Sequence, residues 1–439
     1  MRQGLLVMSK ILIVYHYYGP YPPRATKWDH LFCFKKYAEH TCFYLNLAFW
    51  GIPWFLTRLH FDLVIFHTLF FSLCWKRQAF TRYVCKARPL KQLEAVKIAL
   101  PQDEFVNTDL VCEFLNEFRI NDVFSVAPAS EWPKIYPTVD RRRVRFHQVL
   151  TGYLDDTTVA RVNHLAASIP TRSVDIGYRT GPPDPTLGRH GYRKGEVAAV
   201  FQSRVTSTPL VVDISSRPQD LLLGDEWYKF LLRCKYTLGA ESGSSILDAD
   251  GTLRQRMLAY VAAHPQAPLA EIAAACCPCH DGSLGLAVIA PRHLEACATR
   301  TCQVLIEGDY NGILVPGQHY IALKSDYSNI DQVLQVIQDD QLRQQMIEQA
   351  YGDVVASGRY SYRSFVHFVI HTVLAPTGLA GFARPLSLWE RLAYGWLRLA
   401  ETLAWRCLAW LAAGHRIMVK ILPARAIQWI KSLLVKWFL

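Results

Sequence analysis

Glu295 stands in a sequence context that suits nucleotide binding. Pro291 can occupy the first turn of a helix, where its missing N–H costs nothing, and apolar residues follow on one helical face. A helix N-terminus at the carboxyl end of a parallel sheet offers N–H groups and a partial positive charge to a phosphate. A glutamate in its first turns can accept both hydroxyls of a ribose. The pattern predicts a nucleotide pocket with Glu295 on the ribose; a solvated helix glutamate is the alternative.

The residues that follow carry a family resemblance. Residues 294–337 read LEACATRTCQVLIEG and then DYNGILVPGQHYIALKSDYSNIDQVLQVI. This stretch resembles the C-terminal domain of retaining GT-B glycosyltransferases of the Glu-x7-Glu type, bacterial surface-glycan enzymes among them, including a closing helix that begins near Ser328. The resemblance implies two Rossmann-like α/β domains facing across a cleft. It also implies retention of anomeric configuration and no obligatory metal or cofactor.

The first glutamate of that signature is displaced. The position eight residues before Glu295 is Ala287, whereas CKYTLGAESGSS, residues 234–245, resembles the family's strand and loop with Glu241 in the acidic position. On this interpretation Ser242 and Gly243 contact the donor sugar and phosphates, and residues 246–288 are an insertion. An exposed loop acid is the alternative for Glu241.

Two basic segments precede Glu241 in the sequence. RSVDIGYRTG is expected to be the first strand of the second domain, and LGRHGYRKGEVAAVF places Arg189, Arg193 and Lys194 just before an expected helix. The resemblance implies that Arg179 and Lys194 hold the diphosphate, where preorganised cations would stabilise a departing phosphate. A solvated basic turn is the alternative.

The front of the chain is expected to hold the acceptor. KILIVYHYY, HTCFYLNLAFW and FDLVIFH are apolar runs typical of buried parallel strands. His67 follows the third run, and Asp103 follows KIALP, so both are candidates at strand ends, where catalytic groups collect. A hydrogen-bonded structural histidine is the alternative for His67, and Asp103 could instead cap the helix expected in VNTDLVCEFLNEF.

The last segment, 384–439, is basic and rich in tryptophan. It holds nine basic and two acidic residues, a net +7 of the chain's +11, and six of the twelve tryptophans. A helical wheel of LSLWERLAYGWLRLAETLAWRCLAWL separates a charged half from an apolar half. The charged half contains Glu390, Arg391, Arg398, Glu401 and Arg406. The apolar half contains Leu388, Trp389, Leu392, Trp396, Leu399, Leu403 and Trp410. ARAIQWIKSLLVKWFL repeats the plan. The pattern predicts amphipathic helices on an anionic membrane surface; packing on the protein's own core or on a partner is the alternative.

Other motifs are weaker. Asp248-Ala249-Asp250 is a possible metal-binding DxD but is more typical of a turn. Cys276, Cys277, Cys279 and His280 form half of a zinc pattern with no matching second pair. Most of the excess positive charge lies in the tail and no nucleic-acid-binding motif is present, so nucleic acid is not an expected partner. The scattered cysteines and the lack of an export signal favour free thiols in the cytoplasm.

The sequence therefore predicts three regions, in accord with its 439 residues, 51% hydrophobic and 19% charged. These are an acceptor domain at 9–165, a nucleotide-sugar domain at 170–370 and a membrane-associating tail at 384–439. The expected protein is a cytoplasmic glycosyltransferase, peripheral on the cytoplasmic face, that moves a sugar to a lipid-linked or cell-surface glycan. The alternatives are a metal-dependent transferase using Asp248 and Asp250, and a membrane scaffold on a degenerate GT-B fold.

Overall fold

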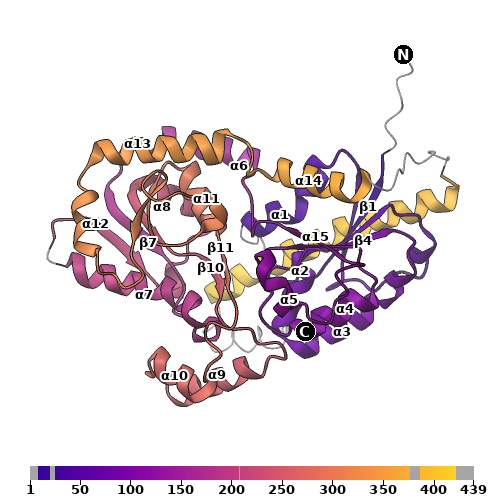
Figure 1. The fold of residues 1–439 in the computed structure, drawn as a ribbon. Helices are drawn as coiled ribbons and strands as arrows, with labels where there is room; N and C mark the ends of the chain where they lie inside the picture. The colour runs from indigo at the N-terminus through magenta and orange to yellow at the C-terminus, as the bar shows by residue number, and fades with distance from the viewer. Residues whose placement is uncertain (1–7, 20–24, 207, 376–385, 422–439) are drawn as a thin grey trace. The chain divides into compact units, whose positions relative to one another are not determined.

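The computed structural model describes residues 8–19, 25–206, 208–375 and 386–421. The chain divides into two compact units (Figure 1). Unit 1 comprises Met1–Ser125, Tyr136–His147 and Val366–Leu439, and unit 2 comprises Val126–Ile135 and Gln148–Phe365. The sequence had predicted a change of domain near 165–170 and a separate tail. The described part of the tail, residues 386–421, instead belongs to unit 1, because its helix packs on that unit's sheet.

Unit 1 is built on a six-stranded sheet with the order β2-β1-β3-β4-β5-β6. The strands are β1 (Lys10–Tyr15), β2 (Thr41–Asn46), β3 (Leu63–Phe66), β4 (Val96–Ala99), β5 (Asp122–Ser125) and β6 (Arg145–Gln148). β1 to β5 pair in parallel. β3 and most of β1 are fully buried, as expected for a sheet covered on both faces. The three apolar runs at the front of the sequence are therefore confirmed as strands.

Several helices surround this sheet, among them α1 (Ala25–Tyr37), α2 (Thr68–Phe71), α3 (Arg77–Ala87) and α4 (Thr108–Glu117). Phe114 of α4 stacks on Phe118 with ring centroids 4.2 Å apart and meets the edge of Phe66 from β3. Aromatic packing of this kind adds to the burial of apolar area, so it fixes α4 against the sheet. α14 (Tyr362–Leu374) runs across the boundary between the two units in the sequence.

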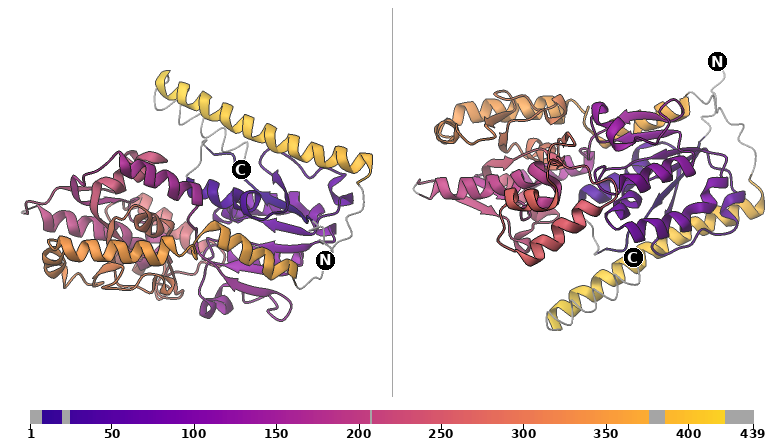
Figure 2. Two further views of the ribbon diagram at one scale, coloured as in Figure 1. Left: turned by 90° about the horizontal axis from the view of Figure 1, so that it is seen from above. Right: turned by 60° about the horizontal axis from the view of Figure 1, so that its bottom comes forward.

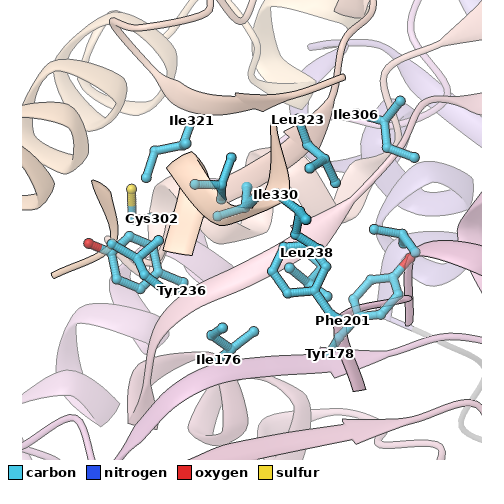
Figure 3. Close-up of a cluster of buried hydrophobic side chains, with 14 of the residues drawn as sticks. Ile176, Tyr178, Phe201, Tyr236, Leu238, Cys302, Ile306, Ile321, Leu323 and Ile330 are labelled. Carbon is cyan, nitrogen blue, oxygen red and sulfur yellow. The ribbon is translucent and has the colours of Figure 1, made fainter. Parts of the chain in front are cut away.

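Unit 2 contains a five-stranded parallel sheet with the order β13-β12-β9-β7-β8. The strands are β7 (Val174–Arg179), β8 (Val212–Ser215), β9 (Cys234–Gly239), β12 (Cys302–Ile306) and β13 (Tyr320–Leu323). Its helices include α6 (Asp156–Ala167), α7 (Gly188–Val205), α8 (Asp225–Arg233), α11 (Pro291–Ala298), α12 (Ile330–Val336) and α13 (Asp340–Ala350). Figure 3 shows the core between sheet and helices, where Tyr178 and Leu238 meet Phe201 of α7 and Ile330 of α12. The predicted Rossmann-like fold is confirmed for each unit.

The expected insertion at 246–288 folds as a pair of helices, α9 (Thr252–Ala263) and α10 (Leu269–Cys276). They share a small core of their own that includes Met257, Ile272 and Cys276. Two short antiparallel strands, β10 (Ser242–Ser244) and β11 (Leu286–Val288), close the base of the insertion. The chain therefore leaves the five-stranded sheet of unit 2 after β9 and returns to it at β12, after α11.

The tail begins with α15 (Leu388–Ile421), a long helix along unit 1 (Figure 2). Its inner face carries Tyr394, Leu397, Ala400 and Ala404, which are all buried. The predicted charged half is wrong in part, because Glu390 and Glu401 are also buried, and Glu401 accepts a hydrogen bond from Lys35 at 2.8 Å. The predicted apolar half is largely exposed. Helix α15 therefore has two apolar faces, one on unit 1 and one opposite.

No helix of the described part of the chain is long and apolar enough to cross a membrane. The second amphipathic segment of the prediction, ARAIQWIKSLLVKWFL, lies outside the described residues. All twelve cysteines are free thiols, as the sequence predicted.

Candidate active site

The strand order of unit 2 locates a binding site. From β7 the chain passes to β8 on one side of the sheet and then to β9 on the other, so the order reverses between β7 and β9. In open parallel sheets, ligands bind at the carboxyl ends of the strands at such a reversal. Arg179 ends β7 and Glu241 follows β9, so both predicted residues stand at this place.

Lys194 and Ser242 lie in contact there. The Nζ atom of Lys194 donates a hydrogen bond of 2.8 Å to the Oγ atom of Ser242. The sequence had placed Arg189, Arg193 and Lys194 just before a helix, and that boundary is wrong. Helix α7 begins at Gly188 and includes all three, because Asp184 and Pro185 form a short turn that starts it earlier. The cations therefore lie in its first two turns.

Gly243 fixes the position of Ser242. It pairs with Ala287 between β10 and β11, and its φ is +132°. A Cβ atom added there would lie 1.8 Å from the carbonyl oxygen of Leu286, so only glycine fits. The close approach of these two strands holds Ser242 beside Lys194.

The carboxylate of Glu241 is half-buried against the loop that follows β12. Its Oε1 atom accepts a hydrogen bond of 2.7 Å from the backbone N–H of Tyr310. A Cβ atom at Gly308 would lie 2.4 Å from Oε2 of Glu241, so the glycine leaves room for this carboxylate. Burial, together with the neighbouring charge of Asp309, raises the pKa of Glu241 above its ordinary value. Glu241 is thus a positioned acid and not a fully exposed loop residue.

Glu295 is also positioned by a distant residue. The indole N–H of Trp227, on α8, donates a hydrogen bond of 2.8 Å to Oε2 of Glu295. Glu295 lies in the second turn of α11, the helix that the sequence predicted after Pro291. The contact orients the carboxylate. Nothing in the local sequence indicates Trp227, because 68 residues separate the pair.

Arg179 is engaged within the sheet. Its guanidinium forms an ion pair of 2.7 Å with Oδ1 of Asp213 and lies over the ring of Phe230 at 4.4 Å. A second arginine, Arg292, donates from Nη1 to the carbonyl oxygen of Arg179 at 3.0 Å. Arg292 was not among the residues predicted from the sequence. A cation in the first turn of α11 is unfavourable with the helix dipole, which prefers acids there. This unusual position is the feature of the sequence that could have indicated a functional residue.

His293 packs between these groups. It is buried, and its ring meets the edge of Tyr310 with centroids 5.2 Å apart. Its Nδ1 atom accepts from the N–H of Ala290 at 3.3 Å, and Nε2 has no hydrogen-bond partner among the described residues. Burial, with Arg292 and Lys194 nearby, holds its pKa well below the ordinary value. His293 is therefore neutral at pH 7.

The two candidates of unit 1 have partners of their own. His67 is buried after β3, where its Nδ1 accepts from the N–H of Leu69 at 3.1 Å and its Nε2 lies 2.8 Å from Nδ1 of His30. Burial lowers the pKa of both rings, that of His30 to about 4. Asp103 accepts a hydrogen bond of 2.6 Å from the indole of Trp75. It does not cap α4, whose first residue is Thr108.

The possible metal-binding residues have structural tasks. Asp248 accepts from the N–H groups of Leu253 and Arg254, and Asp250 accepts from that of Thr252. The DxD motif therefore caps helix α9. In the residues that the structure describes, no three His, Cys, Asp or Glu side chains gather as metal ligands.

No protein-family model matches the chain, and no curated protein matches it. Among solved structures, Anabaena HepE in complex with UDP-glucose is 10% identical, with 84% of this chain and 100% of that chain covered and a TM-score of 0.47. A glycosyltransferase from Rickettsia africae is 10% identical, with 85% of this chain and 100% of that chain covered and a TM-score of 0.47. An alpha-glucosyltransferase in complex with UDP and DNA is 11% identical, with 84% of this chain and 100% of that chain covered and a TM-score of 0.44. At the level of fold, the chain is similar to GT-B glycosyltransferases, with a parallel, helix-flanked sheet of Rossmann-like type in each unit.

Proposed function

We propose that this protein is a glycosyltransferase that uses a nucleotide-sugar donor. The observation that carries the proposal is the group of side chains at the carboxyl ends of β7 and β9. Lys194 and Ser242 are in contact, Arg292 approaches the end of β7, and Glu241 and Glu295 are each held by a hydrogen bond. Cations, hydroxyls and oriented carboxylates are the groups that a diphosphate, a sugar and a ribose require.

Each residue then has a role. Lys194, with Arg292 and the N-terminus of α11, binds the diphosphate, and Glu295 accepts the ribose hydroxyls. Glu241, with Ser242, faces the sugar. The oxygen of the acceptor hydroxyl bonds to the anomeric carbon as the bond from that carbon to the diphosphate breaks, and the hydroxyl proton leaves with the diphosphate. Positive charge already in place stabilises the departing phosphate without reorganisation.

The proposal also covers the stereochemistry, the metal requirement and the acceptor. The transfer retains anomeric configuration and needs no metal, and His67 and Asp103 lie toward the acceptor. Arg179 supports the site through its backbone carbonyl, which receives Arg292. The acceptor is lipid-linked or a cell-surface glycan.

We also propose docking on the cytoplasmic face of a membrane, which the outer side of α15 supports. Six large apolar side chains on its outer side are exposed: Leu388, Trp389, Leu392, Leu399, Leu403 and Trp410. Arg391, Arg398 and Arg406 are exposed beside them. An apolar stripe flanked by arginines suits an interface of anionic headgroups and acyl chains. The basic charge of residues 422–439 adds to the attraction.

Vesicle co-sedimentation of the full chain tests the docking. We expect binding to vesicles of phosphatidylcholine with phosphatidylglycerol, weaker binding to phosphatidylcholine alone, and loss of binding at high salt. The double variant Leu392→Gln/Leu399→Gln should bind at least about 10-fold more weakly, because burying a leucine is worth about 1.5–3 kcal/mol. Leu221→Gln/Leu223→Gln, equally conservative and on exposed leucines of unit 2, is the control. Equal binding by both double variants would show that the outer face of α15 does not bind the membrane.

Release of nucleoside diphosphate tests the enzyme. The purified chain would be incubated with UDP-, GDP-, ADP-, CDP- and dTDP-sugars, with and without membrane extract and EDTA. We expect release from donors of one base, stimulated by extract, insensitive to EDTA and reduced in Lys194→Met. Inhibition by EDTA would favour the metal-dependent alternative. Vesicle binding with no release from any donor would favour the scaffold.

A further inference from the structure

We propose that unit 2 carries a second binding site, for a phosphate or carboxylate group of a small molecule, at the amino ends of β7 and β9. A cavity of about 520 Å³ opens there, lined by the residues that lead into the two strands and by the start of α13. The site proposed for the nucleotide-sugar is at the opposite, carboxyl ends of the same strands. The two sites are therefore distinct, and this inference does not rest on the proposed function.

Two buried groups of residues that line the cavity lack hydrogen-bond partners among the residues that the structure describes. Arg343, at 6% exposure, uses Nε and Nη2 on Oδ1 of Asp340, at 2.9 and 2.7 Å, whereas Nη1 has no partner among the described residues. The hydroxyl of Tyr236, a residue at 1% exposure, likewise has none in the described part of the chain. Leaving a buried polar group unsatisfied costs about 1–3 kcal/mol, so native structures seldom do so.

Both groups can donate a hydrogen bond, so one acceptor group bound in the cavity can serve both. Both residues line the same cavity. An oxyanion presents several acceptor oxygens at once and can satisfy both donors together. Arginine is well suited to phosphate and carboxylate groups, since its planar fork matches their geometry.

The charge of the cavity agrees with an anion. Lys235 pairs with Asp175 at 2.8 Å, and Arg343 pairs with Asp340 at 2.7 Å. Arg172 has no such carboxylate within the described ranges; its guanidinium donates to the backbone oxygens of Cys234, Thr299 and Arg300 at 2.6–2.8 Å. The charged lining residues thus leave one positive charge uncompensated. Burial and the nearby Arg343 lower the pKa of Arg172 to about 10, which still leaves it charged at pH 7.

Thermal unfolding of the full chain with inorganic phosphate tests the site, with sodium chloride at equal ionic strength as the reference. We expect a rise in Tm with phosphate that the chloride does not give. Tyr236→Phe, which keeps the ring and removes only the hydroxyl, should weaken the apparent affinity for phosphate several-fold. Arg343→Met should weaken it at least about 10-fold, as the loss of a charged hydrogen bond implies.

Lys194→Met separates the two sites. It should leave the phosphate response at the cavity unchanged and weaken nucleotide binding, whereas Tyr236→Phe should do the reverse. Loss of the phosphate response in Lys194→Met alone would place the anion in the nucleotide pocket and overturn the proposal. A response equal in wild type and Tyr236→Phe, or no response at all, would mean that water satisfies these donors and would also overturn it.

Discussion

The ammonium group of Lys194 lies 2.8 Å from the hydroxyl oxygen of Ser242, although 48 residues separate them in sequence. Lys194 belongs to the second turn of α7, and Ser242 is the first residue of β10, which follows β9. The contact brings a cation that follows β7 to the carboxyl end of the neighbouring strand. This juxtaposition is what a diphosphate at a strand-order reversal needs.

Lys194→Met should weaken binding of the nucleoside diphosphate by about 10- to 150-fold, since a hydrogen bond to a charged group is worth about 1.5–3 kcal/mol. Isothermal titration calorimetry on the full chain measures this. Lys229→Met is the matched control, because the ammonium group of Lys229 lies on the surface of α8 and pairs with the exposed Glu226 at 2.8 Å. If both variants bind as the wild type does, Lys194 is not on the diphosphate.

Glu295→Gln should discriminate between parts of the ligand. The variant should bind nucleoside diphosphate at least about 10-fold more weakly, because the charged acceptor for the ribose is lost. It should bind inorganic pyrophosphate as the wild type does. Trp227→Phe leaves the carboxylate but not its orienting hydrogen bond, so an intermediate effect is expected. Equal weakening of both ligands by Glu295→Gln would contradict a role at the ribose.

Glu241→Gln should separate stability from activity. Because the pKa of Glu241 is raised above 4.5 in the folded state, folding favours the protonated carboxyl. That contribution is fully present below the unfolded pKa and is lost as the pH rises through the folded pKa. Denaturant unfolding should therefore find the variant more stable than wild type at pH 7 and equal to it near pH 4, while sugar transfer falls. A variant that is less stable at pH 7 than at pH 4, relative to wild type, would refute this.

Much of unit 2 could be predicted from the sequence, because the patterns that indicate its strands and helices involve residues close together in the chain. The strand and helix around Glu295 could be predicted from a proline, an apolar face and a buried run within 16 residues. Contacts over long separations carry no such signal. The hydrogen bond from Trp227 to Glu295 and that from Arg292 to Arg179 depend on how α8, α11 and β7 assemble. Periodicity alone does not specify that assembly.

Helix α15 illustrates a different limit. A helical wheel identified its apolar stripe correctly but assigned the remaining half to solvent. Alanines, together with Tyr394 and Leu397, form a second face, and Glu390 and Glu401 are buried beside it. Small residues contribute little to a hydrophobic average, yet they allow a helix to pack closely on a sheet. Burial of the two acids could not be predicted from their type.

The two faces of α15 should respond differently to truncation. Leu397→Ala should destabilise unit 1 by about 2–5 kcal/mol, because the side chain is fully buried. Leu399→Ala, two residues on and exposed, should change the free energy of unfolding by no more than about 0.5 kcal/mol. Guanidinium unfolding measures both. Equal, small effects would show that α15 is an appended helix and not a part of unit 1.

Thermal unfolding of the full chain with a panel of nucleoside diphosphates and nucleotide-sugars tests the central claim most directly. Wild type, Lys194→Met and Lys229→Met would be compared with and without EDTA. The account predicts stabilisation of wild type and Lys229→Met by nucleotides of one base, about 2.7 kcal/mol at 100 times the dissociation constant, that survives EDTA and is reduced in Lys194→Met. If no nucleotide or nucleotide-sugar raises the Tm of the wild type, unit 2 does not bind the donor and the proposed function is wrong.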